Sequence, residues 1–371
     1  MKPGVVTIIT AAAGQPADTA PGGDVVAQGG QKLEGWMDVA ITLRAEAFPN
    51  DWQLSATSTG AAHTGIDVAE DDFARVLIDD DVVVTGYVNR VTGTGDRQDH
   101  RLILVGRGMT QDLVDCSAEW EAGGQILSAN ALEIATKLAD VYGISVTLAD
   151  GASAGDNVPQ FNLTYGETGA DIIQRVARNA GLLAYEGPDG ALMLATAGAT
   201  KASSGIAFGV NVESYNVMRS SDQRMSEIVC AQAGQDLFSD TGEGGFFFHT
   251  EPDPNVKRHR RLYLVLEQSA LGQEFTIMKA RWEQARRAGR ALAVEVTVDS
   301  WRDSAGRLWL PNTLVDVDVP GAKAALCIAE AQFIRNNDEG TVAKLYLLPP
   351  EAFKPEPISL APVNLNDVTA A

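Results

Sequence analysis

Hydrophobic and polar residues alternate over many short stretches of the chain, a pattern typical of half-buried β-strands. In the first third such stretches cover residues 5–10, 37–43, 52–57, 74–79, 82–88 and 100–106. Turn residues separate them, including Asp80-Asp81 between the fourth and the fifth, and no helical period interrupts them. The pattern predicts a small antiparallel barrel or sandwich, without a helix, over about the first 115 residues.

The period becomes helical from Asn130 onward. Asn130 and Glu133 form a capping pair, and apolar residues at 134, 138 and 141 share one face of a helix that ends at Gly143. A second helix is predicted from Thr168 to Gly181, with one apolar stripe. A hairpin with its turn at 187–190 follows directly. These elements predict a compact α+β module.

Strand patterns resume beyond residue 203, notably at 225–231, and a Gly-rich turn at 242–245 precedes a basic cluster at 257–261. A third helix is predicted at 277–290. Strands at 291–300, 314–319, 325–335 and 341–348 predict a second antiparallel barrel. The Pro-rich segment after Pro349 is expected to be extended.

These patterns predict a mixed β and α+β fold of two antiparallel barrels with α+β insert domains. The expected parts are a first barrel (1–116, with a loop at 15–30), an α+β module (117–200), a second barrel (201–240 plus 291–350), an inserted basic hairpin and helix region (241–290) and an extended tail (351–371).

The composition is that of a folded, strongly acidic protein. Hydrophobic residues make up 45% of the 371 positions, and the formal net charge is −20, which disfavours nucleic-acid binding because phosphate neutralisation needs surplus cations. The three cysteines are far apart and are expected to be free thiols, with Cys116 filling core space. The apolar run at 5–13 is short for a signal peptide, and no stretch approaches the ~18 apolar residues of a membrane span.

The sequence contains no arrangement that predicts catalysis, a cofactor or a metal. The four histidines lie in different segments without ligand spacing, and neither a Gly-x-Ser-x-Gly elbow nor a dinucleotide fingerprint is present. The run Asp79-Asp80-Asp81 could bind a divalent cation, but a solvated hairpin turn is the simpler interpretation.

Positive charge is concentrated between Lys257 and Arg290, where nine basic residues stand against three glutamates, a local charge of +6. This strip is either a solvated helix face or a surface that docks on acidic protein. The candidate interface residues are Arg258, Arg260, Arg261, Arg286 and Arg287.

Several short motifs occur one after another along the chain. They are Gly35-Trp36, Thr85-Gly-Tyr-Val88, Val105-Gly106-Arg107 leading to Thr110-x-Asp112-Leu-Val-Asp115-Cys116, Gly166-Glu-Thr168, Arg258-x-Arg260-Arg261 and Trp309-x-Pro311-Asn312. In their order and spacing the chain resembles the baseplate hub proteins of Mu-like contractile-tailed phages, the phage tail protein P family.

The resemblance implies a non-enzymatic virion structural protein of the tail baseplate, made in the host bacterial cytoplasm. It implies a homotrimer in which two tube-protein-like barrels per subunit form a ring that joins a hexameric tail tube to a trimeric central spike. The expected partners are the tail tube or distal tail protein, the spike and the tape measure protein. DNA passes only in transit, and no stable membrane association is expected. Charge reversal at Arg286 and Arg287 is expected to block ring assembly.

The resemblance marks eight positions as structural: Gly106, Arg107, Asp112, Asp115, Cys116, Trp309, Pro311 and Asn312. Arg107 and Asp112 are expected to pair within the fold, and the Trp309 motif to shape a turn before an edge strand. The acidic balance suggests negative channel walls that do not hold DNA. Two alternatives stay open: a hub with its own cell-wall-degrading activity, and a type VI secretion spike-like subunit, whose chains usually continue into a β-helical spike.

Overall fold

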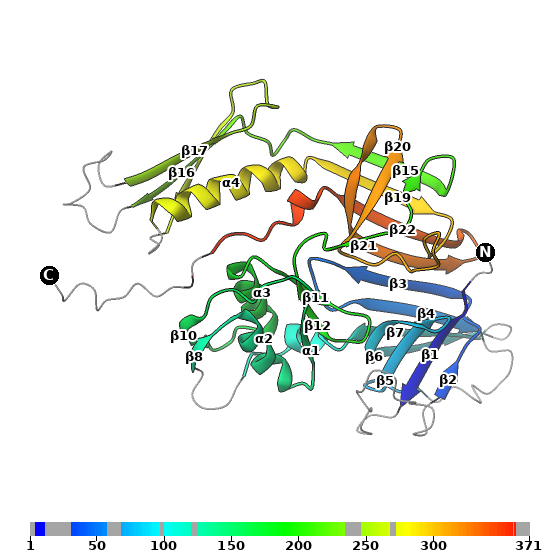
Figure 1. Ribbon diagram of the computed structural model, residues 1–371. Helices are drawn as coiled ribbons and strands as arrows, with labels where there is room; N and C mark the ends of the chain where they lie inside the picture. Colours follow the sequence, from blue (N-terminus) through cyan, green and yellow to red (C-terminus); the bar gives the residue numbers. More distant parts are fainter. Residues whose placement is uncertain are drawn as a thin grey trace.

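The computed structural model describes residues 4–11, 31–57, 68–96, 100–119, 125–233, 246–267, 272–358 and 360. The predicted loop at 15–30, the turn at 242–245 and the end of the tail lie outside these residues. Figure 1 shows a β-rich molecule with a large curled sheet, a helical module beside it and a helix-backed arm extending away from the sheet. Within the described ranges, no helix is long and apolar enough to cross a membrane.

A single sheet of 14 strands forms most of the molecule. Its main path runs β15-β19-β22-β21-β3-β4-β7-β6-β5-β1-β2, and β20 pairs with β21 and with the short strands β13 and β14. The first lobe consists of β1 (Val6–Ala11), β2 (Gln31–Leu33), β3 (Asp38–Arg44), β4 (Asp51–Thr57), β5 (Phe73–Ile78), β6 (Asp81–Gly95) and β7 (His100–Gly108). The second lobe consists of β13 (Thr200–Lys201), β14 (Ile206–Ala207), β15 (Val212–Arg219), β19 (Leu292–Val298), β20 (Thr313–Val319), β21 (Ala322–Asn336) and β22 (Gly340–Leu348).

Two long strands bend the sheet. The first, β6, pairs with β5 through its first half and with β7 through its second, and the register shifts between Val88 and Arg90. The second, β21, pairs with β20 up to Cys327 and with β3 from Glu330 onward, again across a register shift. Such bulges increase the local twist and let one strand serve two neighbours.

The pairing of β21 with β3 joins the two predicted barrels into one sheet. One cluster of buried side chains runs under both lobes, from Ile8 and Trp52 in the first to Trp309 and Phe333 in the second. Two separately closed barrels are therefore not confirmed by the pairing of the described strands. The strand alternation predicted both β3 and β21, but it contains no information on which partner, nearly 300 residues away, completes the sheet.

The middle module contains α1 (Gln111–Asp115), α2 (Ala131–Asp140) and α3 (Gly169–Asn179), with β8 (Gln125–Ala129), β9 (Val146–Leu148), β10 (Val158–Asn162), β11 (Leu183–Glu186) and β12 (Leu192–Ala195). Both predicted helix starts are confirmed as capping boxes, at Asn130 with Glu133 and at Thr168 with Asp171. Val141, predicted on the apolar face, follows the helix and is 44% exposed.

The prediction that no helix interrupts the first 115 residues is wrong, because α1 follows β7 directly. Leu113 of α1 is fully buried in the core of the middle module, beside α3. The middle module therefore begins near Gln111 and not at residue 117, since a five-residue amphipathic turn carries too little period to be recognised in sequence.

The arm consists of β16 (Glu227–Ala233), β17 (Phe246–Pro252), β18 (Arg261–Leu266) and α4 (Gln273–Gly289). Its sheet has the order β17-β16-β18, and α4 packs on one face. The predicted strand at 225–231 was assigned to the second barrel, but β16 is the central strand of the arm. The helix also starts at Gln273, four residues before its predicted start.

The chain beyond β22 is not wholly extended, contrary to the prediction. Pro350–Phe353 forms a 3-10 helix whose Ala352 and Phe353 are fully buried, in a small cluster with Ala45 and Leu348. Burial of an aromatic ring of this size stabilises the turn by about 2 kcal/mol, which a Pro-rich composition alone does not reveal.

Candidate functional site

The motif around Gly106 lies at the end of β7 and leads into α1. Gly106 lies against the indole of Trp52, and a Cβ at this position would come within 2.2 Å of the ring, so no larger residue fits. Arg107 pairs with Asp115 of α1, with its Nη1 3.1 Å from the carboxylate Oδ1. The predicted pairing of Arg107 with Asp112 is therefore wrong, because the helical turn brings Asp115 in front of the guanidinium.

Cys116 is exposed, so the expectation that it fills core space is wrong. It follows the last turn of α1 in an extended conformation, and Leu113 occupies the buried position instead. Asp112 is half-buried, and desolvation together with the neighbouring Asp115 raises its pKa. Tyr142 lies beside Cys116, and burial raises the pKa of its hydroxyl to about 12.

The motif surrounds a buried carboxylate that the sequence analysis missed. Glu186 of β11 accepts hydrogen bonds from the backbone N–H of Asn50 at 2.7 Å and from the N–H and hydroxyl of Thr110, both at 2.9 Å. A Cβ on Gly108 would lie 1.8 Å from its Oε2. Burial outweighs these donors and raises the pKa of Glu186 to about 7. Glu186 thus joins the middle module to the first lobe.

One sequence signal could have drawn attention to Glu186. It is an acidic residue directly before the hairpin turn, at the end of the otherwise apolar and aromatic strand Leu183–Glu186. A charged residue at a buried strand position requires hydrogen-bond partners. Those partners come from Asn50 and Thr110, 136 and 76 residues away, so the sequence alone could not name them.

The Trp309-x-Pro311-Asn312 motif fixes the entry of β20. Trp309 is buried, and its indole N–H donates to the Ser300 carbonyl at 3.1 Å. Asn312 has a positive φ of 59° and is also buried. Its Oδ1 accepts from the Gly198 N–H at 2.6 Å, and its amide donates to the Thr196 carbonyl at 2.9 Å. The motif therefore attaches the end of the middle module to the second lobe.

The large sheet presents one polar face across both lobes. The paired residues of successive strands share a face, because opposed residues in a sheet point the same way. The row from β15 through to β6 is Ser214, Thr297, Lys344, Gln332, Thr42, Asp51, Arg107 and Tyr87. The opposite face carries the shared apolar core.

Most cations of this polar face lie against carboxylates. Arg44 contacts Asp51 at 2.5 Å and Glu330 at 3.3 Å. Lys344 lies 2.5 Å from Glu339, while Arg107 pairs with Asp115 as described. The exception is Arg90 near the β6 bulge, for which no carboxylate partner occurs among the described residues. The face is polar and close to charge-balanced.

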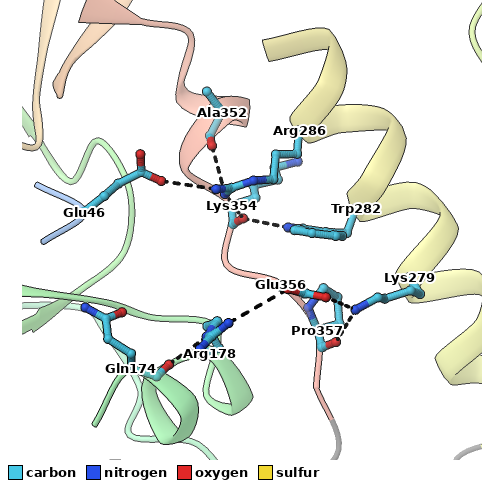
Figure 2. Close-up of polar contacts among 10 residues, drawn as sticks. All are labelled: Glu46, Gln174, Arg178, Lys279, Trp282, Arg286, Ala352, Lys354, Glu356 and Pro357. Carbon is cyan, nitrogen blue, oxygen red and sulfur yellow. Dashed lines mark hydrogen bonds and ion pairs between the residues drawn. The ribbon is translucent and has the colours of Figure 1, made fainter. Parts of the chain in front are cut away.

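The candidate interface arginines of α4 mainly bind their own chain. Figure 2 shows Arg286 reaching the carbonyl oxygens of Ala352 and Lys354, at 3.1 and 3.3 Å, with Glu46 at 3.6 Å. Arg287 contacts Glu283 on the same helix at 2.5 Å. Desolvation lowers the pKa of Arg286. Arg286 therefore holds the arm to the body, Arg287 pairs within its own helix, and the predicted role of both between subunits stays untested.

The segment after the 3-10 helix links the arm to the middle module. The Trp282 indole of α4 donates to the Lys354 carbonyl at 2.7 Å. Glu356 pairs with Lys279 of α4 on one side and lies 3.9 Å from Arg178 of α3 on the other. We name residues 350–357 the latch, because they contact both α4 and α3.

The basic loop before β18 is only partly engaged. Arg260 donates to the carbonyls of Ser221 and Asp222, at 2.7 and 2.9 Å. Arg261 pairs with Glu227 at 2.5 Å. Arg258 is exposed and has no hydrogen-bond or ion-pair partner within the described part of the chain. Of the five candidate interface arginines, it is the one whose charge is free for another molecule.

The aspartate run at 79–81 binds a side chain of the second lobe. Arg302 reaches Asp79 at 2.9 Å and Asp81 at 2.5 Å, so the solvated-turn interpretation is incomplete. No cluster of three metal-ligating side chains occurs among the residues that the structure describes. A pocket of about 770 Å³ opens beside Arg302, but its buried Asp303 accepts hydrogen bonds from the backbone of Ser203, Ala305 and Arg307.

Comparison with known proteins assigns the chain to a family. Family models match residues 25–108 (Mu phage baseplate assembly protein GpP-like, N-terminal), 110–196 (baseplate hub protein gp44-like, second domain) and 274–356 (Mu phage baseplate assembly protein GpP, fourth domain). Baseplate hub protein gp44 of Escherichia phage Mu is 26% identical over 335 residues, 87% of each chain. The chain belongs to the baseplate hub proteins of Mu-like phages.

Solved structures share the fold of this hub protein. The 43 kDa tail protein of prophage MuSo2 from Shewanella oneidensis is 24% identical, with a TM-score of 0.79 over 94% of this chain and 99% of that one. A tail protein from Neisseria meningitidis MC58 is 20% identical, with a TM-score of 0.74 over 95% and 99%. The predicted family, and with it a structural role in the tail baseplate of a phage particle, is confirmed.

Proposed function

We propose that three copies of this hub protein close into a ring that adapts a hexameric tail tube to a trimeric central spike. The continuous sheet carries this proposal, because it holds two strand-rich lobes side by side in one chain. Three chains then supply six lobes on the tube side while keeping threefold symmetry on the spike side. The tail tube or distal tail protein, the spike and the tape measure protein are the proposed partners.

The polar face of the sheet is the proposed wall of a DNA channel. Free cations would hold the phosphate backbone, whereas Arg44 and Arg107 already lie against carboxylates of the same chain. The overall acidity suggested negative walls, but the positive and negative charges of this face are nearly balanced. DNA would therefore adhere weakly because most cations of the face already contact carboxylates. We also propose that the role is mechanical, without catalysis or a cofactor.

The oligomeric state tests the ring. Native mass spectrometry of the purified protein should give a trimer, and electron-microscopy class averages should show a threefold ring of nearly sixfold appearance. A protein that stays monomeric at high concentration, with tube and spike proteins present, would contradict the proposal. Zymography on peptidoglycan should show no clearing, and a cleared zone would favour a lytic hub.

The channel wall is tested by freeing one of its arginines. The double variant Asp51→Asn with Glu330→Gln removes both carboxylates from Arg44. Fluorescence anisotropy with a labelled duplex should detect tighter DNA binding by the variant trimer than by the parent protein at low salt, and the difference should disappear as salt is raised. Equal binding by both proteins would contradict the assignment of this face.

A further inference from the structure

The sheet of the arm has one apolar face that the described part of the chain leaves open. Ala231 of β16 lies opposite Phe248 on one side and Val265 on the other, and Val229 lies opposite Tyr263. Residues opposed in this way share a face. Val265 is 82% exposed and Tyr263 60%, and Phe246 and Phe248 on the same face are also exposed. A contiguous apolar face of this kind marks an interaction surface.

The arm cannot turn this open face toward its own body. The other face is occupied by α4, which contacts Cys230 and Ile228 through Ala280. The latch then fixes α4 on α3 through Trp282 and Glu356, and Arg290 reaches Glu46 of the first lobe at 2.8 Å. The orientation of the arm is thus set by contacts on its covered side, and the open side faces away from the described parts of the chain.

A second exposed apolar cluster lies on the second lobe. Phe208 and Val210, between β14 and β15, are 54% and 78% exposed, and Phe208 packs edge-on against Tyr215 with ring centroids 5.2 Å apart. In Figure 1 the arm strands lie at the left end of the upper layer, while β15 and β20 lie toward its right end. The two apolar surfaces therefore occupy opposite ends of one chain.

The charges beside these two surfaces are opposite in sign. Lys257 and Arg258 are exposed in the loop that leads into β18, next to the open face of the arm. Glu213 and Asp299 are exposed beside the Phe208 cluster, and neither has an ion-pair partner in the ranges that the structure describes. Opposite charges at the rims of two apolar patches favour their contact and disfavour contact between two copies of the same patch.

We infer that the open face of the arm in one copy docks on the Phe208–Val210–Tyr215 cluster of the next copy. The inference rests on the proposed trimer and names the surfaces that close it. Such a contact is heterologous, with a different patch from each copy, and a heterologous contact repeated around a threefold axis makes a closed ring. The partner for the arm is therefore a second copy of this chain.

Single charges placed in either surface test the contact. Val265→Asp and Val210→Asp change highly exposed residues, so the monomer should keep its circular dichroism spectrum and melting temperature. Each variant should associate at least tenfold more weakly, because a carboxylate would replace an apolar contact, and should run as a monomer where the parent runs as a trimer. Thr250→Asp is the control on the arm, at a position nearer the ion pair of Arg261 than Val265 is. We expect it to weaken association less than Val265→Asp does.

Mixing the two variants separates this contact from other arrangements. An equimolar mixture retains one intact arm face and one intact cluster, so it should form a dimer that cannot close. In a Cys116→Ser background, the double variant Val265→Cys with Val210→Cys should oxidise to a covalent trimer, and neither single variant should. A parent that never trimerises contradicts the proposed function. A parent that trimerises together with both aspartate variants overturns only this inference.

Discussion

The middle module and the arm are built from the same parts, yet only one of them closes around its own core. In the middle module α2 and α3 pack on each other and on two small sheets, and Ile172, Ile173 and Val176 of α3 are fully or almost fully buried. In the arm a single longer helix covers one face of a three-stranded sheet, and only four of the 17 residues of α4 are buried: Phe275, Thr276, Ala280 and Gly289. A sheet or helix whose apolar surface is fully covered by other elements forms a core of its own, whereas a sheet covered on one face leaves the other face available for docking.

The two regions also use their cations differently. In the middle module the Arg175 guanidinium makes a bidentate contact with Glu167, which stabilises the entry to α3. In the arm Lys279, Arg286 and Arg290 reach outward to the latch and to Glu46 of the first lobe. The cations of the arm therefore serve mainly to hold it to neighbouring segments, whereas this ion pair of the middle module lies within the module.

The largest predicted effect is the difference in unfolding free energy between a Val→Ala substitution in the middle module and one in the arm. Val176→Ala, at a position 1% exposed, should lower the free energy of unfolding by about 2 kcal/mol, because it removes buried methyl groups and leaves a cavity. Val265→Ala, at a position 82% exposed, should change it by less than about 0.5 kcal/mol. Urea denaturation of the monomer measures both. Equal losses would remove the distinction between the closed and the open region.

The next effect concerns the pH dependence that Glu186 gives to the join between the middle module and the first lobe. Its pKa is about 7 in the folded protein, against an ordinary 4.5. Between these pH values Glu186 keeps a proton in the native state that it has lost in the unfolded chain. The contribution of Glu186 to stability is therefore greatest below pH 4.5 and is lost as pH rises through 7. Glu186→Gln should remove about 1–2 kcal/mol of this pH dependence.

Urea denaturation at several pH values between 4 and 8 checks this, with the parent and the Gln variant compared at each pH. The comparison isolates Glu186 from the many other carboxylates of an acidic chain. Parallel curves for the two proteins would show that the carboxyl does not titrate in that range in the native state.

The smallest effect is expected at the latch. Glu356 is 36% exposed, so Glu356→Gln should cost under about 1 kcal/mol, as partly exposed ion pairs usually do. Trp282→Phe removes the hydrogen bond to Lys354 and keeps most of the ring. Hydrogen exchange should become faster in residues 350–357 and along α4 while α2 is unaffected. Unchanged exchange in α4 would mean that the latch does not hold the arm.

Local signals in the sequence predicted most elements well. The capping pair at Asn130 and the apolar stripe after Thr168 predicted two helix starts, and both starts are present, each with reciprocal capping hydrogen bonds. Alternation predicted most strands of the two lobes to within a few residues, but it did not identify β2, β13, β14 or β15, and β6 continues to Gly95, seven residues past its predicted end. The exposed strands β17 and β18 and the short strand β8 were missed, because they bury too little to produce a clear pattern.

The candidate residues were less predictable than the elements. The motifs drew attention to three residues in tightly packed positions: Gly106, Trp309 and Asn312. Each of these positions restricts either the size of the side chain or the backbone conformation. The partner of Arg107, the exposure of Cys116 and the burial of Glu186 depended on how α1 turns after β7. Side-chain chemistry states what a residue can bind, but only its neighbours decide what it does bind.

By itself, the sequence determined most of the helices and strands, the acidic balance of the chain and the order of motifs that identifies a Mu-like hub protein. These follow from capping, periodicity and composition, which act within a few residues. The tertiary structure alone decided that β21 pairs with β3, that α4 is held by the latch and that one face of the arm stays open. Each of these depends on contacts between distant segments, and such contacts are selected by the packing of the whole chain.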